Sequence, residues 1–120
     1  MGAAGVSRLW IMVAGPYRAG ALGAAARATN LRVLNEAALA VFRRGHVPVI
    51  GVNLALPIIE AAGAESFGEI MMPVSLALAE RCDAVLRIGG PSEGADEEVA
   101  RFRERGLPVF HALDELPEAG

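Results

Sequence analysis

The sequence predicts an α/β protein with a three-layer, doubly wound parallel sheet of four to five strands. Short, continuously apolar runs recur along the chain, as in strands that are buried on both faces. Segments with helical spacing separate these runs, and strands that alternate with helices of about 10–15 residues form parallel sheets. Right-handed crossovers then place helices on both faces, in a Rossmann- or flavodoxin-like arrangement.

Each expected element has its own signal in the sequence. Apolar residues at helical spacing predict a helix over 31–44, with Thr29 or Asn30 as its cap and Gly45 as its stop. Its buried face is expected to consist of Leu31, Leu34, Ala38, Val41 and Phe42. The segment 17–28 before it, rich in Gly and Ala, is expected to be a loop. Pro57 is expected near the first turn of a short helix, and Pro73 marks a break or a late start in the next one. The strands are expected at 9–14, 46–52, 83–88 and 107–110, and the later helices at 54–62, 69–81 and 94–105.

The chain has 120 residues, which predicts a single domain over 1–120 with its core at about 8–113 and a fraying polar tail from Asp114. Hydrophobic residues make up 53% of the chain, enough to bury a core. All 11 basic residues are Arg. The absence of Lys excludes Schiff-base chemistry and a Gly-Lys-Ser/Thr phosphate loop. A net charge of -3 with scattered arginines argues against a nucleic-acid partner.

Few side chains can hold a metal or form a disulfide. Cys82 is the single cysteine, and the two histidines, His46 and His111, are far apart in the sequence. We therefore expect no metal site and no cofactor. The apolar run at 9–14 is too short for a signal peptide, and no run approaches the ~20 residues of a membrane span. A cytoplasmic protein without a membrane partner is expected.

Two loops follow expected strands, at the sheet edge where parallel α/β sheets bind ligands. The first is Gly15-Pro16-Tyr17-Arg18-Ala19-Gly20. Arg18 can bind a phosphate or carboxylate, or it can be an ordinary surface side chain. Tyr17 can stack on a ligand, or it can pack on the sheet edge.

The second loop, Gly89 to Ala95, leads into a helix whose free N–H groups suit an anion. Ser92 offers a hydroxyl there, and Gly94 lets a ligand approach the backbone. Three acids follow, and their plain explanation is stabilisation of the first helical turn. Glu98, however, falls beside the buried stripe of this helix and is a candidate nucleophile or general base. Met71 and Met72 are expected to fill the core.

Together these segments resemble nucleoside 2-deoxyribosyltransferase-like proteins, specifically a branch of small uncharacterised domains, over about 9–110. The Ser-x-Gly-x-x-x-Glu pattern from Ser92 to Glu98 is the most specific part of the resemblance. The other matching segments are Val13 to Tyr17, Asn30, Asn35, Gly45-His46, Cys82 to Val85 and Gly106 to Val109.

The resemblance implies cleavage of an N-glycosidic bond in nucleosides or nucleoside 5′-monophosphates, in a homodimer or higher homo-oligomer. It implies that Glu98 attacks the anomeric carbon, so that a second base or water then resolves the glycosyl-enzyme. It also implies that substrate is bound by Gly15, Pro16, Tyr17, Arg18, Ser92, Gly94 and Ala95. One departure is that Ser75 stands where many members carry an Asp that positions substrate or handles the leaving base.

Two further interpretations stay open. Because a hydroxyl cannot replace a carboxylate as an acid–base group, the chain can instead be a non-catalytic protein that binds a nucleotide or sugar phosphate. A phosphoribohydrolase of the cytokinin-activating type has a similar glycine-rich loop, but the segment Gly89 to Gly94 lacks the Gly-Thr pair of that family.

Overall fold

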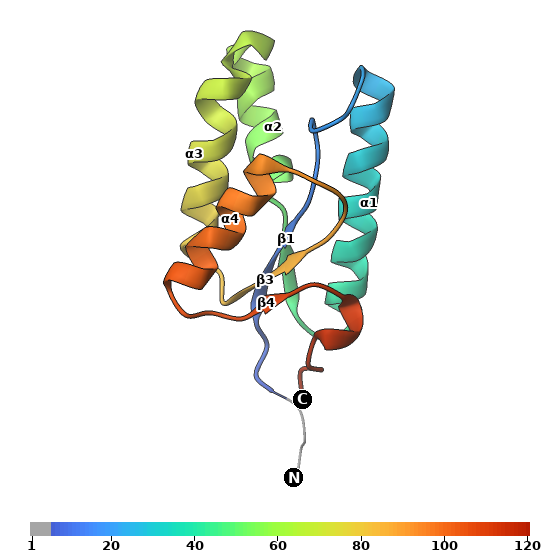
Figure 1. Cartoon of the computed structure of the whole chain (residues 1–120), viewed down its shortest axis with the longest axis vertical. Coiled ribbons are helices and arrows are strands. Elements are labelled where there is room, and N and C mark those ends of the chain that lie inside the picture. The colour runs from blue at the N-terminus through green and yellow to red at the C-terminus, as the bar shows by residue number, and fades with distance from the viewer. Residues whose placement is uncertain (1–5) are drawn as a thin grey trace.

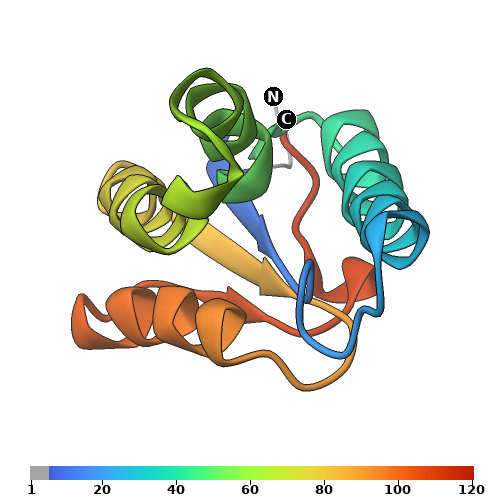
Figure 2. The same cartoon turned by 90° about the horizontal axis from the view of Figure 1, so that it is seen from above.

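The computed structural model describes residues 6–120 and has a four-stranded, all-parallel sheet with helices on both faces (Figures 1 and 2). The strands lie in the order β2-β1-β3-β4. The predicted α/β class and parallel sheet are therefore confirmed, with four strands. The strands are β1 (Trp10–Ala14), β2 (Val47–Val49), β3 (Ala84–Arg87) and β4 (Val109–Phe110), and the helices are α1 (Ala24–Arg43), α2 (Gly51–Ala62), α3 (Phe67–Ala79) and α4 (Glu93–Glu104).

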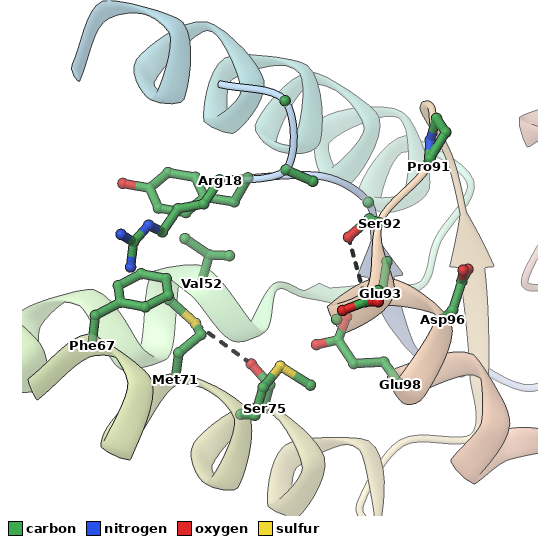
Figure 3. Close-up of a pocket in the computed structure, with 17 residues that line it drawn as sticks. Arg18, Val52, Phe67, Met71, Ser75, Pro91, Ser92, Glu93, Asp96 and Glu98 are labelled. Carbon is green, nitrogen blue, oxygen red and sulfur yellow. Dashed lines mark hydrogen bonds between the residues drawn. The ribbon is translucent and has the colours of Figure 1, made fainter. Parts of the chain in front are cut away.

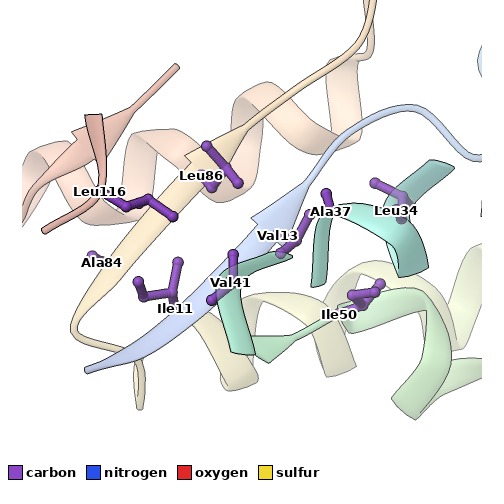
Figure 4. Packing of buried hydrophobic residues seen from close by; sticks show 9 residues of the cluster. All are labelled: Ile11, Val13, Leu34, Ala37, Val41, Ile50, Ala84, Leu86 and Leu116. Atoms are coloured by element: carbon purple, nitrogen blue, oxygen red, sulfur yellow. The ribbon is translucent and has the colours of Figure 1, made fainter. Parts of the chain in front are cut away.

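Alternating side chains of the two central strands divide the core into two layers. Ile11 and Val13 of β1 pack with α1, together with buried residues of β3 and Leu116 near the C-terminus (Figure 4). Met12 and Ala14 point to the opposite face, which α3 and α4 cover. Period-two alternation of side chains along a strand requires this division, and burial of both sets explains why β1 is apolar throughout.

The strand order sets where a ligand can bind. From β1 the chain crosses to β2 on one side, and from β2 it passes over β1 to reach β3 on the other side. The loops after β1 and β3 therefore leave neighbouring strands towards opposite faces of the sheet. A crevice opens between such loops at the carboxyl ends of the strands, where doubly wound sheets bind their ligands.

Helix α1 begins earlier than the sequence predicts. It starts at Ala24 with Gly23 in the capping position, so Thr29 and Asn30 lie inside the helix and the prediction of a cap there is wrong. The alanines at 24–26 and 28 are strong helix formers and extend the helix into the segment expected to be a loop. Phe42 is 64% exposed, so its predicted place on the buried face is also wrong. Val41 is fully buried, as predicted, and because successive helical residues point about 100° apart, Phe42 turns away from the sheet.

Both interior prolines lie within helices. Strand β2 ends at Val49 and α2 begins at Gly51, so Pro57 lies in the middle of this helix and the expected start at Leu54 is wrong. Pro73 lies in the middle of α3, so it neither breaks nor delays this helix. Both prolines are exposed, and water can hydrogen-bond the carbonyls that they leave without an N–H partner.

The C-terminal tail packs onto the domain, so the expected fraying from Asp114 and the core limit near residue 113 are wrong. Leu116 belongs to the core cluster on the α1 side of the sheet. Arg44 donates to the Leu116 carbonyl at 3.2 Å and accepts from Ala119 N–H at 2.9 Å through its own carbonyl. The imidazole of His46 completes this contact, because its Nε2 lies 2.6 Å from the Pro117 carbonyl oxygen and its Nδ1 accepts from Leu9 N–H at 3.0 Å.

Substitution of His46 tests this anchor. The side chain is buried, and the Leu9 N–H donor obliges Nδ1 to accept, so the proton is on Nε2. In His46→Leu both backbone partners lose their hydrogen bonds, and we expect the free energy of unfolding to fall by about 2–4 kcal/mol in urea denaturation. The control His111→Leu replaces an exposed histidine and should change it by less than about 0.5 kcal/mol. If both substitutions lower the free energy of unfolding equally, His46 does not anchor the C-terminal tail.

Candidate active site

The two predicted loops border one cavity with a volume of about 650 Å³, at the carboxyl ends of β1 and β3 (Figure 3). Ligand cavities in proteins typically have volumes of about 300–1,000 Å³. Helices α2 and α3 form the remaining wall. The lining residues are Gly15, Tyr17, Arg18, Ala19, Gly20, Val52, Phe67, Met71, Met72, Ser75, Pro91, Ser92, Glu93, Gly94, Ala95, Asp96 and Glu98.

Gly15 and Pro16 bring the two loops together. A Cβ atom on Gly15 would lie 2.8 Å from the Ile88 carbonyl oxygen, so only glycine permits this close approach. Pro16 packs against Gly89, which has a φ of +79° and where a Cβ atom would lie 2.7 Å from the proline ring. Pro16 does not line the cavity, although it was predicted to bind substrate. Its contact with Gly89 instead helps to position both loops.

An aromatic pair forms one end of the cavity. The rings of Tyr17 and Phe67 are stacked, with centroids 6.3 Å apart and planes 14° from parallel. The guanidinium of Arg18 lies over the Phe67 ring at 4.0 Å, a cation–π contact. Asn30 fixes the first loop, because its side-chain amide donates to the Tyr17 carbonyl at 2.8 Å. Tyr17 and Arg18 therefore contact α3 directly, and the aromatic pair can stack with a planar ligand.

The start of α4 supplies polar groups on the other side. Ser92 caps this helix, since its hydroxyl oxygen accepts from Ala95 N–H at 3.2 Å. The hydroxyl proton remains free to donate to a ligand. Gly94 faces α3, where an added Cβ atom would lie 3.3 Å from the Met72 sulfur. The predicted residues Ser92, Gly94 and Ala95 all line the cavity.

Glu98 is the buried acid of the site. Its side chain is 8% exposed, and it borders the same cavity as Tyr17 and Ser92. Burial raises the pKa of the Glu98 carboxyl from 4.5 to about 7. The Ser75 hydroxyl and the charge of Arg87 oppose this rise, and the charge of Glu97 adds to it. A carboxyl with a pKa near neutrality, in a cavity, can act as a nucleophile, a base or an acid.

Ser75 and Gly51 lie against the Glu98 carboxylate at the floor of the cavity. A Cβ atom on Gly51, the first residue of α2, would lie 2.1 Å from Ser75 Oγ and 3.1 Å from Glu98 Oε2. Only glycine leaves room for these two side chains to approach α2. The Ser75 hydroxyl can donate to the Met71 sulfur at 3.9 Å or turn towards the carboxylate (Figure 3). The polar floor of the cavity therefore consists of one carboxyl group and one hydroxyl group.

Arg87, at the end of β3, fixes the second loop. Its Nε atom lies 3.2 Å from Asp96 Oδ1, and its terminal nitrogens donate to the Ile88 and Gly90 carbonyls. Asp96 itself is largely exposed. Arg87 thus binds the loop and α4 at once, and its positive charge also favours ionised Glu98.

Sequence reasoning did not predict the wall formed by α2 and α3. Met71 was predicted to fill the core, and although it is buried, it also lines the cavity with Met72. Phe67, Met71 and Ser75 recur at intervals of four residues and so share one face of α3. A lone serine on an otherwise apolar helical face was the available signal for a polar site.

The fold and cavity define a class: a doubly wound α/β protein with a buried carboxyl at its topological switch point. No protein-family model, curated protein or solved structure matches the chain. Within residues 6–120, no helix is both long and apolar enough to cross a bilayer. The same residues contain no cluster of three or more His, Cys, Asp or Glu side chains that could hold a metal ion.

The raised pKa of Glu98 predicts a pH-dependent cost to stability. Between pH 4.5 and about 7 the folded state binds more protons than the unfolded state, so stability falls as pH rises through this window. Glu98→Gln mimics the neutral acid and avoids the loss. We expect it to raise the free energy of unfolding by up to about 3 kcal/mol at pH 8 and to change it little at pH 4.

Urea denaturation at both pH values checks this prediction. The control Glu104→Gln removes an exposed carboxylate from the same helix and should change stability by less than about 0.5 kcal/mol at either pH. A destabilised Glu98→Gln protein at pH 8 would show that ionised Glu98 is instead held by favourable contacts.

Proposed function

We propose that the chain cleaves the N-glycosidic bond of (deoxy)nucleosides or nucleoside 5′-monophosphates and transfers the sugar to a second base or to water. The observation that carries the proposal is the buried Glu98 carboxyl at the floor of the cavity that Tyr17 and Ser92 also line. A pocket of this size with one perturbed acid and apolar walls is a suitable place for glycosidic chemistry.

In the proposed reaction, ionised Glu98 attacks the anomeric carbon as the bond to the base breaks. The positive charge that develops on the sugar is then close to the carboxylate, and apolar walls strengthen that attraction by excluding water. The resulting glycosyl ester is opened by a second base or by water. With a pKa of about 7, the ionised form of Glu98 that attacks is available at neutral pH.

The remaining lining residues suit the parts of a nucleotide. The stacked rings of Tyr17 and Phe67 offer an aromatic surface to the base. The free Ser92 hydroxyl and the N–H groups at the start of α4 can bind a sugar hydroxyl or a 5′-phosphate. Arg18 is exposed at the rim and is the lining residue that can pair with a phosphate.

A second candidate function is binding of a nucleotide or sugar phosphate without turnover. The observation that favours it is Ser75, because the side chain beside the Glu98 carboxylate is a hydroxyl and not a second acid. General acid or base assistance is worth about 10²–10⁴-fold in rate. The two functions differ in whether Glu98 turns the substrate over without the help of a second acid.

The test is release of free base from (deoxy)nucleosides and their 5′-monophosphates, followed by chromatography with and without acceptor bases. We expect release that is lost in Glu98→Ala and kept in Glu97→Ala, which removes an exposed neighbouring carboxylate. We also expect kcat/KM to rise with pH through an apparent pKa near 7, because the ionised form is the nucleophile. Thermal stabilisation by nucleotides without turnover supports the second function, and no response to any of these compounds overturns both.

A further inference from the structure

The charged groups around the cavity are mostly acidic. Among its lining residues, Glu93, Asp96 and Glu98 carry carboxylates, and Arg18 carries the single positive charge. Arg87 lies behind the second loop, where its donors are held by Asp96 and by backbone carbonyls. A cation bound beside the ionised Glu98 carboxylate is therefore attracted by that carboxylate.

The aromatic end of the cavity already binds a planar cation. The guanidinium of Arg18 lies 4.0 Å from the centre of the Phe67 ring, and Tyr17 stacks with the same ring. Delocalised planar cations are attracted to aromatic faces. Arg18 is on an exposed part of the first loop and can move aside for a ligand of similar shape and charge.

Among residues 6–120, the floor of the cavity contains no second acid that could protonate a leaving base. Ser75 is the polar side chain beside Glu98, and it is 1% exposed. Asp96 is at the exposed rim in its ion pair with Arg87, and Glu93 is exposed as well. A neutral base leaves as an anion unless it is protonated, whereas a positively charged base leaves as a neutral molecule and needs no proton.

Building on the function proposed above, we propose that the preferred substrates are N-glycosides of a cationic base, such as pyridinium ribosides or N7-alkylated purine nucleosides. The C1′–N bond breaks, its electron pair neutralises the base, and Glu98 forms an ester to C1′. Water then attacks C1′, the electron pair of the ester bond returns to the carboxylate, and the water proton passes to solvent. The first step consumes the positive charge of the substrate and the negative charge of Glu98 together.

A cationic substrate also favours the ionised form of Glu98, which is the form that attacks it. Burial disfavours the charged form of Glu98 in the free protein, and a positive charge brought next to the carboxylate lowers its pKa again. A neutral nucleoside displaces water from the cavity without supplying that charge. The substrate cation thus offsets the desolvation of Glu98 at the moment when the ionised form is needed.

The test compares 7-methylguanosine with guanosine, which differ by one methyl group and one positive charge, and adds nicotinamide riboside as a second cationic probe. Each kcat/KM is divided by the rate of uncatalysed hydrolysis, because cationic nucleosides are intrinsically more labile. We expect this ratio to be at least about 10²-fold larger for the two cations than for guanosine, the lower limit of what an acid contributes.

Ser75→Asp places an acid beside Glu98, with Ser75→Asn as a control of nearly the same size. We expect Ser75→Asp to raise kcat/KM for guanosine by about 10²-fold without a gain for 7-methylguanosine, and Ser75→Asn to give neither gain. If Ser75→Asp does not fold, the comparison in the wild-type protein decides alone.

The outcomes separate this inference from the proposed function. If base release from guanosine depends on Glu98, and its kcat/KM divided by the uncatalysed rate is as large as for the cations, the charge preference is overturned. The proposed function then still stands. No release from any of the three compounds or from the wider nucleoside panel overturns both. Release from the cations with the expected excess supports both.

Discussion

The site depends on the close approach of three helices around one buried carboxyl group. The start of α2, the middle of α3 and the second turn of α4 meet at Gly51, Ser75 and Glu98. A side chain on Gly51 would overlap Ser75, so the absence of a Cβ atom there allows the carboxylate and the hydroxyl to lie against the start of α2. Burial of an acid costs stability when the acid is ionised. Acids with a raised pKa in a cavity are typical of functional sites, and this supports the proposed role of Glu98.

The strand order places this carboxyl at the point where a ligand can reach it. Because β1 and β3 are neighbours whose following loops diverge, the sheet opens a crevice above their ends. The two loops are then held by specific contacts: Gly15 passes close to Ile88, Pro16 packs on Gly89, and Arg87 binds the second loop to α4. The cavity is thus bordered by loops that the sheet positions and by a helical pair that closes one side.

The sequence predicted those parts of the fold and site that depend on local pattern. Apolar runs located all four strands, and Glu98 was correctly expected beside the buried stripe of α4, which consists of Ala95, Val99 and Phe102. The start of α1 was wrong because alanine propensity extended the helix beyond the expected cap. The interior prolines were misleading because an exposed helical face tolerates the loss of an N–H donor.

The α2–α3 wall of the cavity depends on tertiary packing, which local patterns do not show. Phe67 and Met71 have the spacing of an ordinary core-facing stripe, and Ser75 is the single polar residue in it until α4 brings Glu98 against them. The same packing explains why Glu98 is buried, since from the sequence alone a Glu near the start of a helix is explained by stabilisation of the helix dipole. Its burial, and with it the raised pKa, follows from the meeting of three helices.

The mass of the protein during turnover tests the role of Glu98. The proposed reaction passes through a covalent glycosyl-enzyme, so acid quenching with a slow substrate such as a 2-deoxy-2-fluoro nucleoside should trap an adduct. Intact-mass spectrometry should show the protein heavier by one sugar residue, and peptide mapping should place that mass on Glu98. An adduct on a different residue, or base release without any adduct at Glu98 under conditions where the substrate is consumed, would show that Glu98 is not the nucleophile.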